Sequence, residues 1–155
     1  MQIEITLNGE SERQDVRAST TLLEFIREHA GLKGTKDYCH SGVCGACTVL
    51  VDGEAVSSCS VLAAQANGKT VLTVEGLTPA EGLHPIQQAF VDNFGLQCGY
   101  CTPGMVLLTK AMLDENPAPT REEIVSYMGG NICRCTGYAG ILKSVEAAVV
   151  AMRES

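Results

Sequence analysis

Apolar and polar side chains alternate at the start of the chain, where Ile3, Ile5 and Leu7 are separated by polar residues. This alternation is typical of a strand with one buried face. An Asn-Gly dipeptide follows, which favours a tight hairpin turn, and we expect the return strand over residues 13–17. A helix is then predicted over residues 22–30, because hydroxyl residues can cap its start, apolar residues form one face, and a glycine follows it.

A second hairpin is the clearest in the chain. Residues 48–51 and 54–57 form its predicted strands, with an Asp-Gly dipeptide between them. A last strand is predicted over residues 70–74. A small mixed sheet crossed by one helix is the β-grasp type of arrangement, which we expect for residues 1–75.

The pattern becomes helical after residues 76–84, which carry Gly, Pro and Thr without an apolar period and are predicted to be a linker. Prolines near helix starts and a Thr/Glu capping box mark the expected helix bounds. Four helices are predicted, over residues 85–94, 102–115, 120–129 and 136–153. A sheet followed by helices favours the α+β class, here a β-grasp domain and then a four-helix-bundle domain over residues 85–155.

Charge and composition exclude several classes of function. The 155 residues carry a formal net charge of −7 without a basic run, which disfavours nucleic acid and anionic membrane surfaces as partners. The N-terminus lacks the features of a signal peptide, and no apolar run approaches transmembrane length. We expect no membrane insertion and a cytoplasmic, reducing location, where clustered cysteines favour metal or redox chemistry over structural disulfides.

The eight cysteines form two groups of four. The first group has the spacing C-x4-C-x2-C followed by a distant fourth cysteine, which is the plant-type ferredoxin pattern for a [2Fe–2S] cluster. Its members are Cys39, Cys44, Cys47 and Cys59. Zinc, a disulfide pair or inert buried thiols are the alternatives, and three ligands crowded on one loop fit zinc poorly.

The second hairpin explains how the distant cysteine joins its group. A two-residue turn makes the register run back so that Cys47 lies opposite Ser58, which brings Cys59 beside Cys47. Gly42 and Gly45 give the intervening loop the freedom to curl tightly around a cluster and to bring amide groups near its sulfurs.

The second group has the less specific spacing C-x2-C followed by C-x-C. Its members are Cys98, Cys101, Cys133 and Cys135. In both pairs, a Cys-Thr dipeptide stands immediately before a predicted helix, and helix N-termini favour an anionic thiolate site. A zinc site and a thioredoxin-like redox pair remain alternatives, although the redox pair lacks the βαβ pattern that it needs.

Three motifs around the cysteines carry a family resemblance. They lie in residues 34–49, 97–105 and 130–138, and read GTK with C-x4-CGACTV, QCGYCTPGM and GNICRCTGY. In this order, over nearly the whole chain, they resemble the iron–sulfur (small) subunit of the molybdenum hydroxylases of the xanthine dehydrogenase, aldehyde oxidoreductase and carbon monoxide dehydrogenase type. The resemblance implies an oxidoreductase subunit with a plant-type ferredoxin-like domain and a helical domain, each holding one [2Fe–2S] cluster.

The resemblance also implies partners and a direction of electron flow. A large subunit would bind the molybdopterin cofactor and perform the substrate chemistry, and a medium subunit would bind FAD, in a dimer of heterotrimers. Gln97 and Cys135 would lie against the pterin. Electrons would pass from molybdenum to the helical-domain cluster, then to the β-grasp-domain cluster, and then to the flavin or another acceptor.

One local departure from the family stands out. The family usually has glycine just before the first cysteine of the plant-type loop and an acidic residue just after it, where this chain has Tyr38 and His40. A side chain at position 38 excludes a glycine-only conformation, so the departure bears on the local backbone shape and on the potential of the cluster, while the cysteines are intact. His40 is expected to be solvated.

The chain shows no acid–base dyad, nucleophile pair or nucleotide loop, so no catalytic residue is predicted on it. The leading hypothesis is an electron-transfer subunit of a molybdenum-containing complex. A free-standing two-cluster ferredoxin is the alternative, and a zinc-stapled adaptor or redox sensor is the third. A free ferredoxin has no need of the cofactor-facing residues around Gln97 and Cys135.

Overall fold

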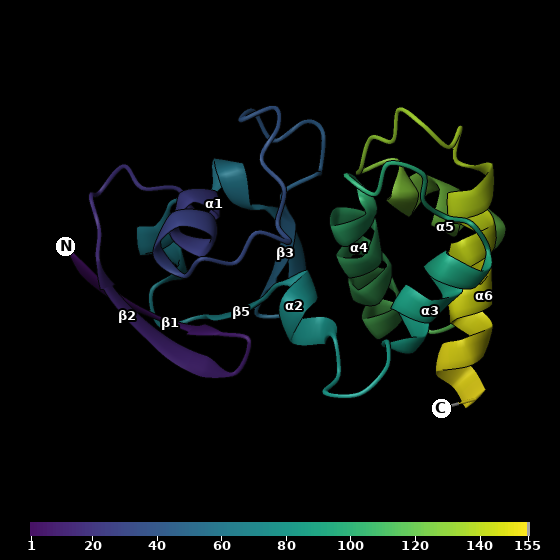
Figure 1. Ribbon diagram of the computed structural model, residues 1–155, viewed down its shortest axis with the longest axis horizontal. Helices are drawn as coiled ribbons and strands as arrows, with labels where there is room; N and C mark the ends of the chain where they lie inside the picture. The colour runs from purple at the N-terminus through teal and green to yellow at the C-terminus, as the bar shows by residue number, and fades with distance from the viewer. Residues whose placement is uncertain (155) are drawn as a thin grey trace.

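Five strands of the N-terminal half form one mixed sheet in the computed structural model, which describes residues 1–154 (Figure 1). The strands are β1 (Gln2–Leu7), β2 (Glu10–Asp15), β3 (Thr48–Val51), β4 (Glu54–Ser57) and β5 (Thr70–Leu72). Their order across the sheet is β2-β1-β5-β3-β4. The central pair β1 and β5 is parallel, and the other pairs are antiparallel.

Both predicted hairpins are confirmed, and each has a two-residue turn in the left-handed region. The backbone φ is 53° at Asn8 and 89° at Gly9, and 51° at Asp52 and 90° at Gly53. These values match the turn whose twist suits a hairpin. The predicted return strand over residues 13–17 was wrong in its bounds, because a two-residue turn starts the pairing at once, with Leu7 opposite Glu10.

The predicted helix over residues 22–30 is confirmed as α1 (Leu22–Glu24), which continues as a π-helical turn over Phe25–His29. Thr21 and Glu24 form a capping box at its start. The apolar face of the helix packs against the sheet, and the side chains between them form a core. The core of this half contains Ile3, Ile5, Leu7, Val16, Leu22, Phe25, Ile26, Val49, Val51, Ala63, Ala66 and Val71.

Helices make up the second half of the chain. They are α2 (Val74–Leu77), α3 (Pro85–Asp92), α4 (Thr102–Glu115), α5 (Arg121–Met128) and α6 (Ala139–Glu154). The predicted strand over residues 70–74 ends at Leu72, and the predicted linker over residues 76–84 begins inside α2, whose Leu77 is buried in the helical core. No helix within residues 1–154 is long and apolar enough to span a bilayer.

The start of α6 is the clearest difference from the sequence prediction. The helix was expected from residue 136, but it begins at Ala139. Gly137 and Tyr138 have φ values of 61° and 68°, and this left-handed conformation cannot belong to a right-handed helix. A left-handed turn at residues 137–138 therefore delays the helix.

Strand β3 belongs to the cores of both halves. Val49 and Val51 are buried in the core under α1, whereas Leu50, which points to the opposite face, is 3% exposed and packs in the core of the helices. Strand β3 contacts α4 directly, and Figure 1 shows the two side by side in the middle of the molecule. The halves are therefore joined by packing and not by the connecting segment alone.

Candidate metal centres at the eight cysteines

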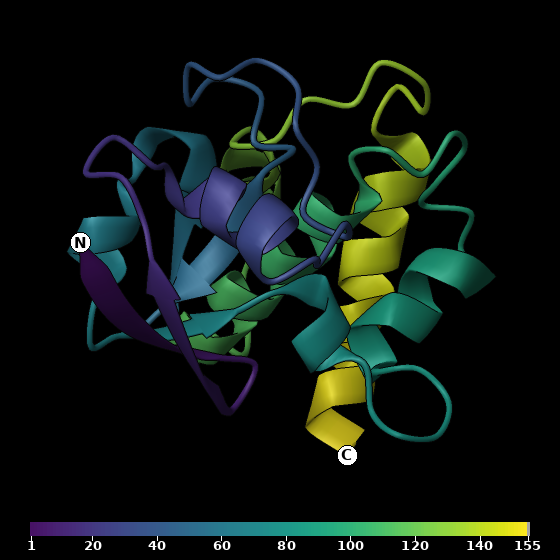
Figure 2. The same ribbon diagram turned by 60° about the vertical axis from the view of Figure 1, so that its left-hand side comes forward.

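Both cysteine groups lie toward one end of the molecule. The glycine-rich loop before β3 and the loop between α5 and α6 rise together at the top of Figures 1 and 2. Three cysteines of the first group lie on the first loop, and Cys59 lies on a short 3₁₀ turn over Ser58–Ser60 after β4. The second group lies before α4 and between α5 and α6.

The hairpin register brings the fourth cysteine to the first group as predicted. Val51 pairs with Glu54. At the other end of the hairpin, the Ser58 amide and hydroxyl donate hydrogen bonds to the Cys47 carbonyl, at 3.3 Å and 2.7 Å. Cys59 therefore lies beside Cys47. Burial, together with the neighbouring Cys59 thiol, raises the pKa of Cys47 to about 11.

The other end of this loop is polar. The amides of Ser41 and Cys44 each donate to the Cys39 sulfur at 3.5 Å. Hydrogen bonds from the Ser41 hydroxyl and amide and from the Cys44 amide lower the pKa of Cys39 to about 5. Amide groups aimed at sulfur stabilise negative charge there, which suits a thiolate ligand.

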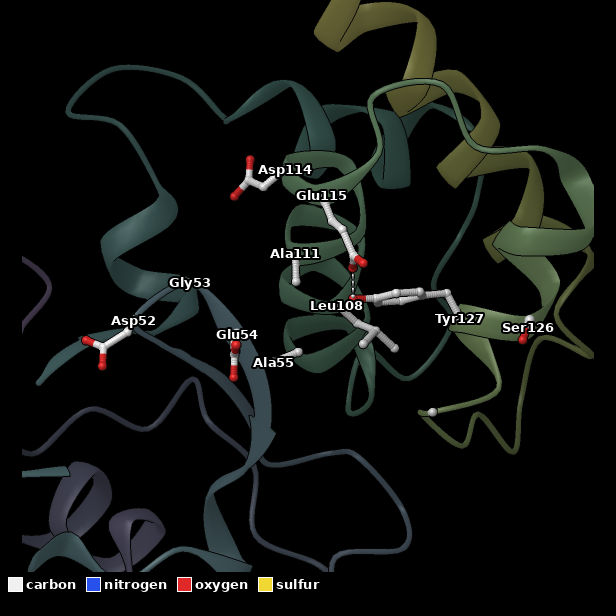
Figure 3. A pocket seen from close by; sticks show the side chains of 11 residues that line it. Asp52, Gly53, Glu54, Ala55, Leu108, Ala111, Asp114, Glu115, Ser126 and Tyr127 are labelled. Carbon is white, nitrogen blue, oxygen red and sulfur yellow. Dashed lines mark hydrogen bonds between the residues drawn. The ribbon is translucent and has the colours of Figure 1, made fainter. Parts of the chain in front are cut away.

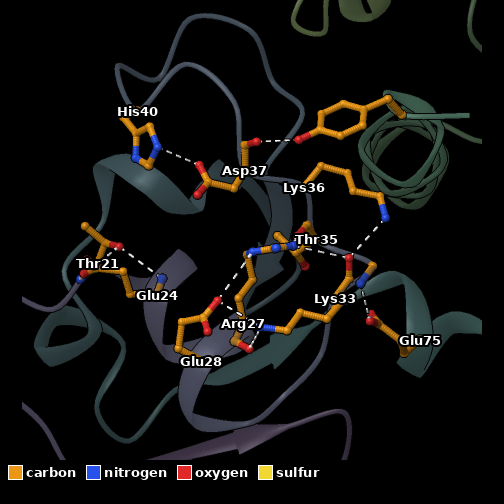
Figure 4. Close-up of polar contacts among 12 residues, drawn as sticks. Thr21, Glu24, Arg27, Glu28, Lys33, Thr35, Lys36, Asp37, His40 and Glu75 are labelled. Atoms are coloured by element: carbon orange, nitrogen blue, oxygen red, sulfur yellow. Dashed lines mark hydrogen bonds and ion pairs between the residues drawn. The ribbon is translucent and has the colours of Figure 1, made fainter. Parts of the chain in front are cut away.

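Polar contacts at its base hold the first loop in place (Figure 4). The Arg27 guanidinium donates to the Thr35 carbonyl at 2.7 Å, and the Gly34 amide donates to a Glu75 carboxylate oxygen at 2.6 Å. His40 pairs with Asp37 at 2.8 Å and is largely exposed. The sequence did not reveal this support, because its partners lie on three separate elements.

Tyr38 does not strain the loop. The left-handed φ values in this loop occur at His40 (54°), Gly42 (71°) and Gly45 (71°), and Tyr38 is not among the left-handed residues. Tyr38 therefore has no glycine-only conformation, in agreement with the exclusion that its side chain implies. The unusual conformation falls on His40, two residues further along.

The second group approaches in two pairs of thiols. The sulfurs of Cys98 and Cys135 lie 3.4 Å apart, although 37 residues separate them in the sequence. Cys101 and Cys133 form the second pair, since each thiol shifts the pKa of the other. The Cys133 sulfur also contacts the Thr136 hydroxyl at 3.2 Å and accepts a hydrogen bond from the Thr136 amide at 3.4 Å.

The pKa values in this group diverge within each pair. Burial and the Cys133 thiol raise the pKa of Cys101 to about 12, whereas burial of Cys133 is outweighed by the Thr136 hydroxyl and amide, which lower its pKa. The Tyr100 amide and the Cys135 thiol lower the pKa of Cys98, and the Cys98 thiol raises that of Cys135. In each pair the neighbouring thiol therefore raises the pKa of one cysteine, because two adjacent thiolates repel each other. A bound cation removes this repulsion.

Only one of the two predicted helix starts is at a cysteine. Cys101 is the N-cap residue of α4, as expected. Cys135 is followed by Thr136, and α6 starts three residues later, so the expectation for this position was wrong. Thr136 instead turns back and donates to the Cys133 sulfur. The hydroxyl and amide of Thr136 thus interact with the Cys133 sulfur, where the N-terminus of a helix was expected.

The two groups differ in exposure. Cys44, Cys47, Cys59 and Cys101 are buried, whereas Cys98 and Cys135 are exposed. Gln97, which precedes Cys98, is exposed as well. The second group therefore has one edge toward the interior, at Cys101, and one edge toward the surface.

Hydrogen bonds join the two cysteine-bearing loops to each other. The Ile132 amide donates to the Cys44 carbonyl at 2.8 Å, and the fully buried Asn131 side-chain amide donates to the Gly45 carbonyl at 3.0 Å. Gly104 of α4 also packs there, since a Cβ at that position would lie 2.6 Å from the Gly45 carbonyl oxygen. These contacts could not be predicted from the sequence, because a buried Asn and a helical Gly have no distinct sequence signal.

A pocket of about 400 Å³ lies between the groups and is lined by five cysteines, Cys44, Cys98, Cys101, Cys133 and Cys135. A wider pocket of about 790 Å³ lies between the β3–β4 turn and helices α4 and α5 (Figure 3). Four carboxylate residues and Tyr127 line it, and no cysteine does. The cysteines therefore lie at the smaller pocket and on the loops around it, and none lines the wider pocket.

The arrangement of thiols suits a two-iron cluster. Within residues 1–154, no three or more His, Cys, Asp or Glu side chains come together as a site for one metal ion. The sulfurs of Cys98 and Cys135 are in contact, and backbone amides donate to the sulfurs of Cys39 and Cys133. A [2Fe–2S] cluster takes two ligands at each of its two irons, so paired thiols near donors provide the chemistry that it needs.

Comparison with protein families divides the chain into two matched domains. Residues 5–73 match the family described as 2Fe-2S iron-sulfur cluster binding domain, and residues 73–146 match the [2Fe-2S] binding domain family. Together the two domains cover most of the chain, and each contains one of the cysteine groups. The chain therefore has two [2Fe–2S]-binding domains.

Whole-chain relatives point the same way. The nicotinate dehydrogenase small FeS subunit of Eubacterium barkeri is 46% identical, over 95% of this chain and 94% of its own length. The aldehyde oxidoreductase iron-sulfur-binding subunit of Escherichia coli K12 is 42% identical, over 96% of this chain and 71% of its own length. In the crystal structure of quinoline 2-oxidoreductase from Pseudomonas putida 86, a chain that is 44% identical superposes with a TM-score of 0.95, over 100% of this chain and 97% of that one. The chain belongs to the family of small iron–sulfur subunits of the molybdenum hydroxylases.

Proposed function

We propose that this chain is the electron-transfer subunit of a molybdenum hydroxylase complex and holds one [2Fe–2S] cluster in each half. One observation supports this most directly: each matched [2Fe–2S] domain contains one group of four cysteines, and in each group at least one sulfur accepts hydrogen bonds from backbone amides. The proposed ligands are Cys39, Cys44, Cys47 and Cys59 in the first half and Cys98, Cys101, Cys133 and Cys135 in the second. When bound, a cluster takes up and releases one electron at a time.

The exposure of the second group supports a direction for the relay. We propose that the helical half faces a molybdopterin-binding large subunit, with Gln97 and Cys135 against the pterin. Both residues are exposed, as a contact with another subunit requires. Electrons then enter at the helical half, cross to the β-grasp half and leave to an FAD-binding medium subunit or another acceptor.

The finer features of the fold and assembly belong to the same proposal. Residues 1–75 and 85–155 are the two domains, joined by residues 76–84. Helix α4 contacts α3 and α5, and α6 contacts the same two helices, which supports a four-helix bundle. A dimer of heterotrimers is the proposed assembly. Eight free cysteines, none in a disulfide, are compatible with a cytoplasmic, reducing location.

Spectroscopy of the purified chain tests the proposal. Reduction with dithionite should produce two distinguishable [2Fe–2S] EPR signals. Cys59→Ser should affect only the signal of the first half, and Cys133→Ser only that of the second. Ser126→Ala is the control, because it keeps all eight cysteines and changes an exposed residue of α5 at the wider pocket. Zinc in place of iron, with neither EPR signal, would contradict every electron-transfer function.

The oligomeric context separates the complex from a free ferredoxin. Copurification of the native chain with a molybdenum-containing partner, assayed for molybdenum and flavin, supports the complex. Recovery of the chain alone at native expression, with both clusters present, would support the free-standing two-cluster ferredoxin instead.

A further inference from the structure

Two tyrosines from opposite halves meet beside the cysteine groups. Tyr100, between Cys98 and Cys101, donates a hydrogen bond from its hydroxyl to the carbonyl of Asp37, 63 residues away in the sequence. The Tyr100 ring also meets the Tyr38 ring edge to face, with centroids 6.2 Å apart and an interplanar angle of 70°. One hydrogen bond and one aromatic contact therefore link the two halves here.

Both rings lie on the outer side of the space between the groups. They line the pocket of about 400 Å³ together with five cysteines. Tyr38 is 74% exposed and Tyr100 is 43% exposed, whereas Cys44 and Cys101 of the same pocket are 7% and 8% exposed. The tyrosines are thus the exposed part of the pocket lining, and these two cysteines are its buried part.

The pair also completes the attachment of the first loop. The C-terminal arm of that loop is tied to the helical half by the bonds from Ile132 to Cys44 and from Asn131 to Gly45. Its N-terminal arm, which leads into Cys39, is tied to that half by the tyrosine contacts. Both arms are therefore held against chain segments that carry cysteines of the second group.

We propose that Tyr38 and Tyr100 form a clasp that holds the Cys39 arm against the Cys98–Cys101 turn and thereby fixes the relative placement of the two cysteine groups. Both are positioning residues, since neither is a proposed ligand. The consequence for electron transfer rests on the proposed function, whereas the mechanical role of the clasp does not. The aromatic contact requires a ring at position 38, where the resemblance leads one to expect glycine.

Four variants separate the parts of the clasp. Tyr100→Phe keeps the ring and removes the hydroxyl donor, and Tyr38→Ala removes the aromatic contact. Tyr38→Phe keeps that contact and serves as the conservative rescue. Tyr127→Phe is the matched control, because it removes a hydroxyl that contacts Glu115 at 3.4 Å, in the wider pocket away from the cysteines.

Hydrogen exchange in the full-length protein gives a readout that does not need enzymatic activity. The amides of Lys36 and Cys44 donate hydrogen bonds within the loop, so peptides across residues 36–44 report its opening. We expect exchange there to be about five-fold faster in Tyr100→Phe and in Tyr38→Ala, as the loss of one modest contact predicts. Tyr38→Phe and Tyr127→Phe should exchange at the wild-type rate.

EPR provides the second readout. The magnetic interaction between two reduced clusters depends on their separation, so the splitting of their signals should change in Tyr100→Phe and Tyr38→Ala alone. Wild-type exchange rates in both of these variants would overturn the clasp. Faster exchange in them, in samples where even the wild type shows no [2Fe–2S] signal, would support the clasp and contradict the proposed function.

Discussion

Adding one methyl group at Gly45 tests how tightly the two halves are joined. Gly45 has a φ of +71°, and a Cβ there would collide with the Gly130 carbonyl oxygen and lie 2.8 Å from the Asn131 Cα. Both obstacles are backbone atoms of the helical half, so they cannot move aside as a flexible side chain can. Gly45→Ala must therefore push the two loops apart or distort one of them.

The magnitude follows from two costs. A left-handed conformation costs a non-glycine residue about 1–2 kcal/mol. Overpacking at a tight contact adds about 1–3 kcal/mol. Gly53→Ala is a matched control, because Gly53 has a φ of +90° and no atom within 4 Å of its added Cβ. The difference between the two variants, about 1–3 kcal/mol, isolates the contact between the halves.

Thermal and urea unfolding of the full chain, at matched iron content, measure this difference. For a chain of this size, each kcal/mol shifts the midpoint by about 2–4 °C, so Gly45→Ala should melt about 2–12 °C below Gly53→Ala. Equal losses of unfolding free energy in the two variants, within about 0.5 kcal/mol, would refute the reasoning. The close approach of the loops would then not contribute to stability.

Three further predictions concern other parts of the structure. Asn131→Ala removes a buried hydrogen bond to the β-grasp half and should lower the unfolding free energy by about 1–3 kcal/mol in urea, and an unchanged midpoint would contradict this. Burial lowers the pKa of His84, whose Nδ1 accepts the Ile86 amide at 3.2 Å. The unfolded chain therefore takes up a proton at His84 first, near pH 6.5, so stability should fall as pH drops through that value, and His84→Asn should remove this part of the decline. Glu75→Gln replaces a charged acceptor of the Gly34 amide with a neutral one, which should speed exchange of that amide about five-fold, whereas an unchanged rate would exclude a charge contribution.

Turns and helix starts could be predicted from the sequence where the residues that specify them lie within one short segment. The Asp-Gly turn between β3 and β4 and the capping box at Thr120, which starts α5, are both present. The start of α6 was predicted too early, because Gly137 and Tyr138 adopt a left-handed turn. A tyrosine does not indicate such a conformation in a sequence. Helix α2 was missed because its four residues are too short for a period to show.

Cysteine spacing and turn residues were enough to sort the eight cysteines into two groups of four and to predict the register that brings Cys59 to Cys47. Spacing and turn chemistry act over a few residues, so both can be read without the fold. Three contacts became visible only in the folded chain: Cys98 contacts Cys135, Leu50 of β3 packs among the helices, and Asn131 donates to the Gly45 carbonyl. These contacts join segments tens of residues apart. An apolar or polar pattern indicates which face of an element is buried, but the packing of whole elements decides what that face meets.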